Sequence, residues 1–150
     1  MRVVLTTVKE ARVEIDNKVV GAISNGFLLL VGFTDGDDKD TVNKMVDKIL
    51  SLRVFPDEHG QINISLQDVN GSILSVSQFT LYANAAKGRR PSFVDAMNPG
   101  SAEPLYDYFN EQLILKHQKV STGIFGADMK VYSINDGPFT LLLDSKELFN

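Results

Sequence analysis

The sequence contains no cysteine, which excludes disulfide bonds, thiolate metal ligands and a cysteine nucleophile together. It has only two histidines, His59 in a Pro-Asp-Glu-His-Gly turn and His117 near the end of a predicted helix. Neither has the spacing of a metal site. The motifs G-x-S-x-G, S-x-x-K and H-E-x-x-H are absent, as is a glycine-rich phosphate loop. We therefore expect no metal and no cofactor, and any enzyme here lacks an obvious histidine base.

Long hydrophobic runs and an excess of positive charge are also missing. The longest apolar run, Phe27–Phe33, has the length of a strand, far short of the ~20 residues that cross a bilayer. No signal peptide is visible and cysteine is absent, so we expect a cytoplasmic protein with no membrane partner. The formal net charge is −4, whereas a protein that holds nucleic acid mainly by its phosphates would be basic. Any contact with nucleic acid must therefore be local.

Length and hydrophobic patterning predict a single α/β domain over residues 1–150. One helix is expected at about 38–52, and a second runs from Ser101, as its cap, to His117. Asp16–Lys18 is predicted to be a hairpin turn. Strand patterns occupy two short segments within 2–15, and then 27–33, 53–55, 61–66, a stretch from Ile73, 129–134 and 139–143. This order predicts a mixed, largely antiparallel, curved sheet with two main helices packed on one side, and leaves open a closed barrel or stacked layers.

The segment Ser77–Thr80 departs from the pattern of its own strand. Leu74 and Val76 alternate as on one face of a half-buried strand, but Gln78 and Thr80 come next on that face. Polar groups facing a core cost free energy unless paired, so this departure marks a candidate site. A strand that simply ends there explains the pattern equally. Thr80 could be a nucleophile, but no base for it is visible; backbone N–H groups could instead stabilise an oxyanion.

Two loops hold further candidates. Residues 83–100 form a long loop of the kind that is often functional, with basic residues that either meet nucleic acid or are merely solvated. Asn135–Pro138 joins two predicted strands, either as a plain hairpin turn or as a rigid wall against a ligand. The basic residues of the first loop are Lys87, Arg89 and Arg90.

Taken together, these segments resemble the D-aminoacyl-tRNA deacylase family, also called the D-tyrosyl-tRNA deacylase family. Its S-Q-F-T signature matches Ser77–Thr80, and its N-x-G-P-[VT]-T signature is similar to Asn135–Thr140. The R-P-S-F and F-G-A-D-M patches match Arg90–Phe93 and Phe125–Met129, and Leu105–Phe109 resembles a helix of the family. The resemblance runs from the N-terminal strand to Leu143.

The resemblance implies a homodimer with active sites at its interface. Such an enzyme hydrolyses the ester that joins a D-amino acid, or glycine, to the terminal adenosine of tRNA. A cis Gly-Pro peptide of one subunit then enters the partner's pocket and excludes L-amino acids. We favour attack by water, helped by the ribose 2′-OH, over attack by Thr80; an RNA-end binding module without turnover and a purely structural dimer are the alternatives. The implied catalytic residues are Ser77, Gln78, Phe79 and Thr80; the implied substrate-binding residues are Gly137, Pro138, Asn135, Met129 and Phe125; and Lys87, Arg89 and Arg90 would contact tRNA.

Two positions depart from the family pattern. Phe139 stands where the family usually has valine, behind the Gly-Pro step. Thr7 stands where it usually has an arginine that is associated with holding the Gly-Pro loop. Threonine cannot make a fork of charged hydrogen bonds. Either Arg2 or Arg12 takes over that contact, or the loop is held less firmly.

Overall fold

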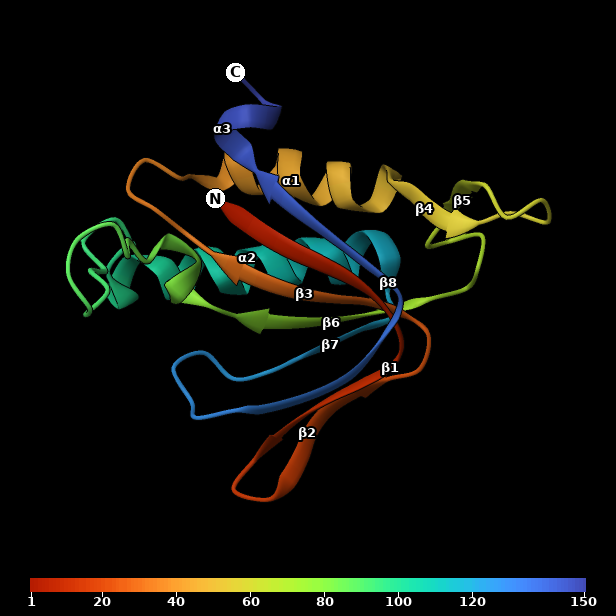
Figure 1. The fold of residues 1–150 in the computed structure, drawn as a ribbon, viewed down its shortest axis with the longest axis horizontal. Coiled ribbons are helices and arrows are strands. Elements are labelled where there is room, and N and C mark those ends of the chain that lie inside the picture. Colours follow the sequence, from red (N-terminus) through yellow and green to blue (C-terminus); the bar gives the residue numbers. More distant parts are fainter.

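A computed structural model describes all residues from Met1 to Asn150. One sheet contains the strands β1 (Arg2–Ile15), β2 (Lys18–Ile23), β3 (Gly26–Gly32), β6 (Ser72–Ser77), β7 (Val120–Thr122) and β8 (Lys130–Asp144). Their order is β2-β1-β3-β6-β7, and β8 lies on β1. β1 is long enough to pair with three strands, with β3 along its first half, β2 along its second half and β8 along both (Figure 1). The pairs made by β1 are antiparallel, as predicted, whereas β6 pairs in parallel with β3 and β7.

The first strand is continuous where the sequence pattern predicted two segments. Register shifts between Val13 and Glu14 and on either side of Val8 bend it without ending it. The predicted turn after it is confirmed, because Asp16 and Asn17 have φ angles of 50° and 63°, as a tight hairpin requires. The bend carries the β1–β2 hairpin back over the sheet, where the Ser121 hydroxyl of β7 donates to the Ala22 carbonyl of β2 at 3.3 Å. The curved sheet is therefore nearly closed.

Two hydrophobic clusters fill the two faces of this sheet. The helices α1 (Lys39–Ser51) and α2 (Pro99–His117) pack on one face, where they bury residues such as Ile49 and Phe109 against β1 and β3. The smaller cluster lies inside the curl of the sheet and consists of Val8, Ala11, Val13, Leu28, Leu74 and Val76. The prediction of a mixed α/β fold with two main helices on one side is confirmed. A short helix, α3 (Ser145–Leu148), follows β8.

The two clusters explain why β6 differs from the strand expected there. Leu74 and Val76 face the inside of the curl, and Ile73 and Ser75 on the opposite face are also buried. The interpretation as a half-buried strand was therefore wrong. A strand with neighbours on both sides, covered on one face by α2 and on the other by the curled hairpin, has no face left for solvent.

The helix boundaries follow their caps. Asp38 caps α1 by accepting a hydrogen bond from the Thr41 amide at 2.9 Å. The prediction that Ser101 caps α2 was wrong: the cap is Asn98, whose side chain accepts from the Ser101 amide at 3.1 Å. Pro99 follows it as the first helical residue, where a proline loses no intrahelical hydrogen bond.

The remaining elements lie beside this frame. β4 (Arg53–Pro56) and β5 (Ile62–Ser65) form a separate hairpin, and Phe55 stacks on Phe27 of β3 at 5.4 Å between ring centroids. A short 3₁₀ helix, η1 (Phe79–Tyr82), follows β6. None of the helices combines the length and apolar character that a membrane crossing requires.

Candidate active site

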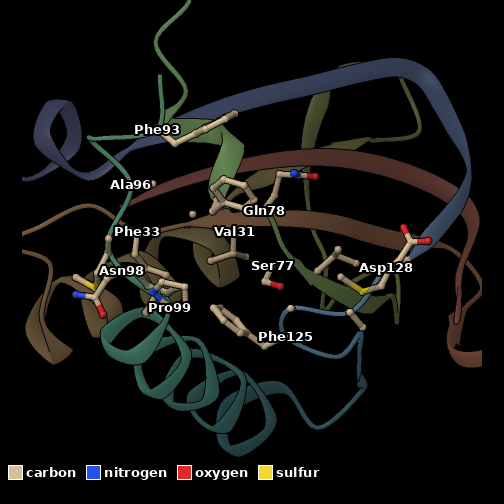
Figure 2. A pocket seen from close by; sticks show the side chains of 18 of the residues that line it. Val31, Phe33, Ser77, Gln78, Phe93, Ala96, Asn98, Pro99, Phe125 and Asp128 are labelled. Carbon is tan, nitrogen blue, oxygen red and sulfur yellow. The ribbon is translucent and has the colours of Figure 1, made fainter. Parts of the chain in front are cut away.

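A pocket of about 650 Å³ opens where β6 ends. Figure 2 shows Ser77 and Gln78 on one side of it, Phe125 and Asp128 on another, and Asn98 and Pro99 at the start of α2. Val31, near the end of β3, and Phe33, just after it, also line the pocket. Most of the lining is apolar, and Asp128 supplies its only charged side chain. The pocket therefore suits a small organic group that carries a few polar atoms.

The strand-end wall of this pocket consists of Ser77, Gln78 and Phe79. The Gln78 amide donates to the Val31 carbonyl at 2.7 Å, after which the chain turns into η1. Gly32 permits this close approach, because a Cβ atom there would lie 2.8 Å from the Gln78 carbonyl oxygen. The strand thus ends where its alternation stops, and the residues at that end line a pocket. The two interpretations of the pattern, a strand end and a candidate site, therefore describe the same residues.

Thr80 lies beside this wall, exposed, and is not part of the pocket lining. Its hydroxyl oxygen accepts a hydrogen bond of 2.6 Å from the Gln78 side-chain amide, which cannot act as a base. No carboxylate or imidazole hydrogen-bonds to Thr80. The backbone here carries possible hydrogen-bond donors. The first hydrogen bond of η1 runs from the Leu81 amide to the Gln78 carbonyl, so the amides of Phe79 and Thr80 make no hydrogen bond within η1.

The second wall is the loop of residues 123–129. It turns at Gly126, which has a φ of 78°, and the Ala127 amide closes the turn on the Ile124 carbonyl at 3.2 Å. Phe125 and Met129, both expected in the pocket, line it together with the strand-end wall. Phe125 also packs on the ring of Tyr106 from α2, with 5.9 Å between ring centroids.

The third wall was missed by the sequence interpretation. Phe93, Ala96 and Met97 belong to the long loop in which only the basic residues were named as candidates. Phe93 packs edge-on against Phe79 at 5.2 Å, and both rings are exposed at the mouth of the pocket. The sequence contained a signal for this wall, because Phe93 is the last residue of the R-P-S-F patch that resembles the family. Lys87, Arg89 and Arg90 are exposed on the same loop and do not line the pocket.

The Gly-Pro segment lies outside the pocket of its own chain. Residues 136–139 bulge from β8 between the β1 pairings Thr6–Thr140 and Val8–Asn135, so the predicted hairpin is one continuous strand with a bulge. Both halves pair with β1 in the same direction, and the chain therefore does not reverse. Asn135 closes the bulge: its side-chain oxygen accepts from the Phe139 amide at 3.0 Å, and its side-chain nitrogen donates to the Thr140 hydroxyl at 3.0 Å. The Gly137-Pro138 bond is cis, and both residues are exposed.

No group of three histidine, cysteine or carboxylate residues lies close enough to hold a metal. The chain also matches a known protein family along most of its length. Residues 4–144 match the family model described as D-Tyr-tRNA(Tyr) deacylase. The chain belongs to this family, which is a family of hydrolases.

Relatives of this deacylase family match the chain along nearly its whole length. Proteins named D-aminoacyl-tRNA deacylase from Lactobacillus gasseri and an Exiguobacterium species are 58% and 54% identical, and the matches cover 96% of this chain and at least 98% of each relative. A solved structure named c-Myc DNA Unwinding Element Binding Protein is 39% identical with a TM-score of 0.90, over 96% of this chain and 98% of that one. A probable eukaryotic D-amino acid tRNA deacylase, 21% identical, shares the fold with a TM-score of 0.82, over 95% of this chain and 97% of that one.

Thr7, one of the two positions where this chain departs from the family pattern, has a contact of its own. Thr7 is buried opposite the bulge of β8 and donates its hydroxyl to the Asp136 carbonyl at 2.8 Å. Neither arginine replaces the missing one: Arg2 donates to Asp144 and to the Leu81 carbonyl, both at 2.9 Å, and Arg12 pairs with Glu14. The segment next to Gly137 is therefore held by a neutral hydrogen bond. A substitute cation is absent there.

Proposed function

We propose that this chain hydrolyses the ester between a D-amino acid, or glycine, and the 3′-terminal adenosine of tRNA. The observation that carries the proposal is the pocket at the end of β6, lined by Ser77, Gln78 and Phe79, in a chain of the deacylase family. The pocket's one charged side chain, Asp128, is paired with Lys130 at 2.9 Å, so the lining presents no unpaired charge to the reacting group. An uncharged ester at a single-stranded RNA end needs no large basic surface, which agrees with the net charge of −4.

In the proposed mechanism, water attacks the ester carbonyl with help from the ribose 2′-OH. The bond between the carbonyl carbon and the ribose oxygen then breaks, and that oxygen takes up the proton that the water gives up, so that the free amino acid and the free tRNA end leave. The amides of Phe79 and Thr80, at the start of η1, donate to the oxygen on which negative charge develops. Ser77 and Gln78 hold the ribose, and Phe125 and Met129 enclose the aminoacyl group. The hydrogen bond between Gln78 and the Thr80 hydroxyl supports this role for the backbone, since it leaves the hydroxyl without a base.

In the proposed assembly, two copies of the chain form a homodimer with the active sites at their interface. Gly137 and Pro138 of one copy enter the pocket of the other and exclude L-amino acids by their main-chain atoms. The exposure of this Gly-Pro segment, outside its own pocket, supports such a role. Exposed apolar side chains beside it on β8, among them Tyr132 and Ile134, support burial against a second copy.

The loop of residues 83–98 is the proposed contact with the tRNA itself. Lys87, Arg89 and Arg90 are exposed there, and an isolated bridge between Asn84 and Ser92 joins the two ends of the basic stretch. We propose that these cations steer the acceptor stem, in the cytoplasm, toward the pocket on whose rim Phe93 lies.

The test is hydrolysis of tRNA charged with D-tyrosine by catalytic amounts of the purified protein without added metal. D-tyrosine should be released, while the same tRNA charged with L-tyrosine should stay intact. Tight binding of D-tyrosyl-tRNA without hydrolysis would select the alternative of an RNA-end binding module. Neither binding nor hydrolysis would leave only a structural role for the chain.

A further inference from the structure

The backbone carbonyl of Ser75 lies where three elements of the pocket meet. It accepts a hydrogen bond from the Gly123 amide at 2.9 Å and another from the Tyr106 hydroxyl, also at 2.9 Å. The Ser75 side chain donates in turn to the Tyr106 oxygen at 3.4 Å. Ser75 and Tyr106 are both buried. A carbonyl oxygen has two lone pairs, and these two donors occupy both.

Each partner of this carbonyl leads directly to a wall of the pocket. Two residues after Ser75, β6 reaches Ser77 and the strand-end wall. Gly123 opens the second wall, and two residues later Phe125 lines the pocket and packs its ring on that of Tyr106. Tyr106 therefore contacts the strand that leads to the first wall through its hydroxyl, and the second wall through its ring.

The surroundings of Tyr106 favour a fixed geometry. Burial raises the pKa of its phenol, so that the hydroxyl keeps its proton and remains a donor at neutral pH. A buried hydrogen bond has no competing water, and its loss leaves polar atoms unpaired. The helix that carries Tyr106 is packed against the sheet through Phe109 and Leu113, so the phenol is held on a rigid element.

We propose that Tyr106 is a positioning residue of the pocket. Its phenol, acting through the Ser75 carbonyl, sets the separation of the strand-end wall from the 123–129 wall. This separation then decides how well aminoacyl groups of different size fit between Phe79 and Phe125. The inference rests on the proposed hydrolysis of D-aminoacyl-tRNA for its effect on turnover, but the wall geometry itself does not depend on any reaction.

The test replaces Tyr106 with phenylalanine, which keeps the ring and removes the hydroxyl. The matched control is Tyr108→Phe on the same helix, since the Tyr108 hydroxyl donates to the Asn43 side chain at 2.9 Å and Tyr108 does not line the pocket. In Tyr106→Phe the Gly123 amide still satisfies the Ser75 carbonyl and only the Ser75 hydroxyl loses its acceptor, so this variant is expected to fold. The values of kcat and KM are measured for tRNA charged with D-alanine and with D-tyrosine.

In Tyr106→Phe, kcat/KM is expected to fall by about tenfold for at least one substrate, below the hundredfold that a 1 Å misplacement can cost. The ratio of the two kcat/KM values should change by at least about threefold, because the two aminoacyl groups differ in size. Tyr108→Phe should lower the melting temperature and leave the ratio unchanged. An unchanged ratio in Tyr106→Phe, or an equal change in both variants, would overturn the proposal.

Hydrogen–deuterium exchange separates this inference from the proposed function. Amide exchange across residues 123–127 should become faster in Tyr106→Phe and not in Tyr108→Phe, whether or not any ester is hydrolysed. If the wild-type protein leaves both substrates intact while exchange changes as expected, the proposed function fails and the positioning role stands. If the protein is active and exchange across residues 123–127 is the same in both variants, the positioning role fails.

Discussion

Three threonine hydroxyls near the two halves of the proposed site have three different environments. Thr7 donates to the Asp136 carbonyl next to the Gly-Pro step. Thr6, its neighbour, has a buried hydroxyl oxygen with no hydrogen-bond partner. Thr80 is exposed and accepts from the Gln78 side chain. The first hydroxyl anchors the segment beside Gly137, the second anchors nothing and the third contacts a residue of the strand-end wall, so substitutions at the three positions should have different outcomes.

Thr7→Val is expected to lower the free energy of unfolding by about 1 kcal/mol, the usual contribution of one hydrogen bond. It should also weaken discrimination between D- and L-tyrosyl-tRNA, because the backbone beside Gly137 loses its anchor. Thr6→Val is the matched control and should be neutral or stabilising, since it removes a buried hydroxyl that has no partner. Denaturant unfolding and the ratio of the two deacylation rates measure these effects. Equal destabilisation by both substitutions would contradict the role of the Thr7 hydrogen bond.

Thr80→Ala tests which group attacks the ester. If water attacks and the backbone stabilises the oxyanion, kcat should fall by less than about tenfold, whereas removal of a true nucleophile costs several orders of magnitude. Single-turnover hydrolysis of D-tyrosyl-tRNA gives the rate directly, and Thr80→Ser is the control that keeps a hydroxyl. A loss of about 10⁴-fold in Thr80→Ala, restored by serine, would identify Thr80 as the nucleophile.

At the scale of elements, Arg2 joins the ends of three segments. From the start of β1, its guanidinium donates to Asp144 at the end of β8 and to the carbonyl of Leu81 in η1, each at 2.9 Å. It also lies over the ring of Tyr82, 4.6 Å from the centroid. Because η1 carries Phe79 and Thr80, this contact anchors the strand-end wall from behind. Arg2, one of the two arginines considered as a substitute at position 7, thus serves the other half of the proposed site.

The pair of Arg2 and Asp144 predicts a pH dependence of stability. Burial raises the pKa of Asp144, but hydrogen bonds from Arg2 and the Lys146 amide outweigh that effect and leave the pKa below its ordinary value of 3.8. A carboxyl whose pKa is lower in the folded than in the unfolded state stabilises the fold fully at pH values above its ordinary pKa. This contribution disappears as the pH falls further, through the folded-state pKa.

Unfolding of the wild type and of Asp144→Asn, measured between about pH 6 and pH 2.5, tests this dependence. The wild type should be the more stable at pH 6, and the difference should shrink below about pH 4. A difference that stays constant across this range would contradict the expected linkage.

At the scale of the whole molecule, β8 has an unusual surface for a strand of the main sheet. Its residues from Lys130 to Pro138 are all exposed, and they include Val131, Tyr132 and Ile134. Tyr132 and Ile134 share one face by the alternation of the strand, and exposed apolar side chains close together are typical of an interaction site. Because the Gly-Pro segment ends this surface, burial of β8 against a second copy would bring Gly137 and Pro138 close to a pocket other than their own.

If two copies pair as proposed, Ile134→Lys should shift the protein from dimer to monomer and abolish deacylation, since each pocket would then lose the partner's Gly-Pro segment. Ile62→Lys is the control, because Ile62 is equally exposed but lies on the separate β4–β5 hairpin. Sedimentation velocity gives the oligomeric state, and the deacylation assay gives the activity. A monomeric Ile134→Lys protein with full activity would rule out a composite site.

The sequence by itself determined much of this protein. Helical spacing predicted α1, the pair Asp16-Asn17 predicted the first hairpin, and the end of the alternation at Ser77 marked one half of the proposed site. These features depend on local properties of the chain, namely periodicity, backbone conformation and the cost of burying polar groups. The family signatures are local in the same sense, because each is a short run of neighbouring residues.

Only the tertiary structure decided which distant residues meet. No pattern along β6 shows that its second face is covered, because the curled hairpin that covers it comes from the start of the chain. The same holds for Phe93 in the pocket, for Thr7 against Asp136 and for Tyr106 against Ser75. Such contacts depend on the register of the strands and on the curvature of the sheet. The curvature accumulates over many strand pairings, so no single segment determines it.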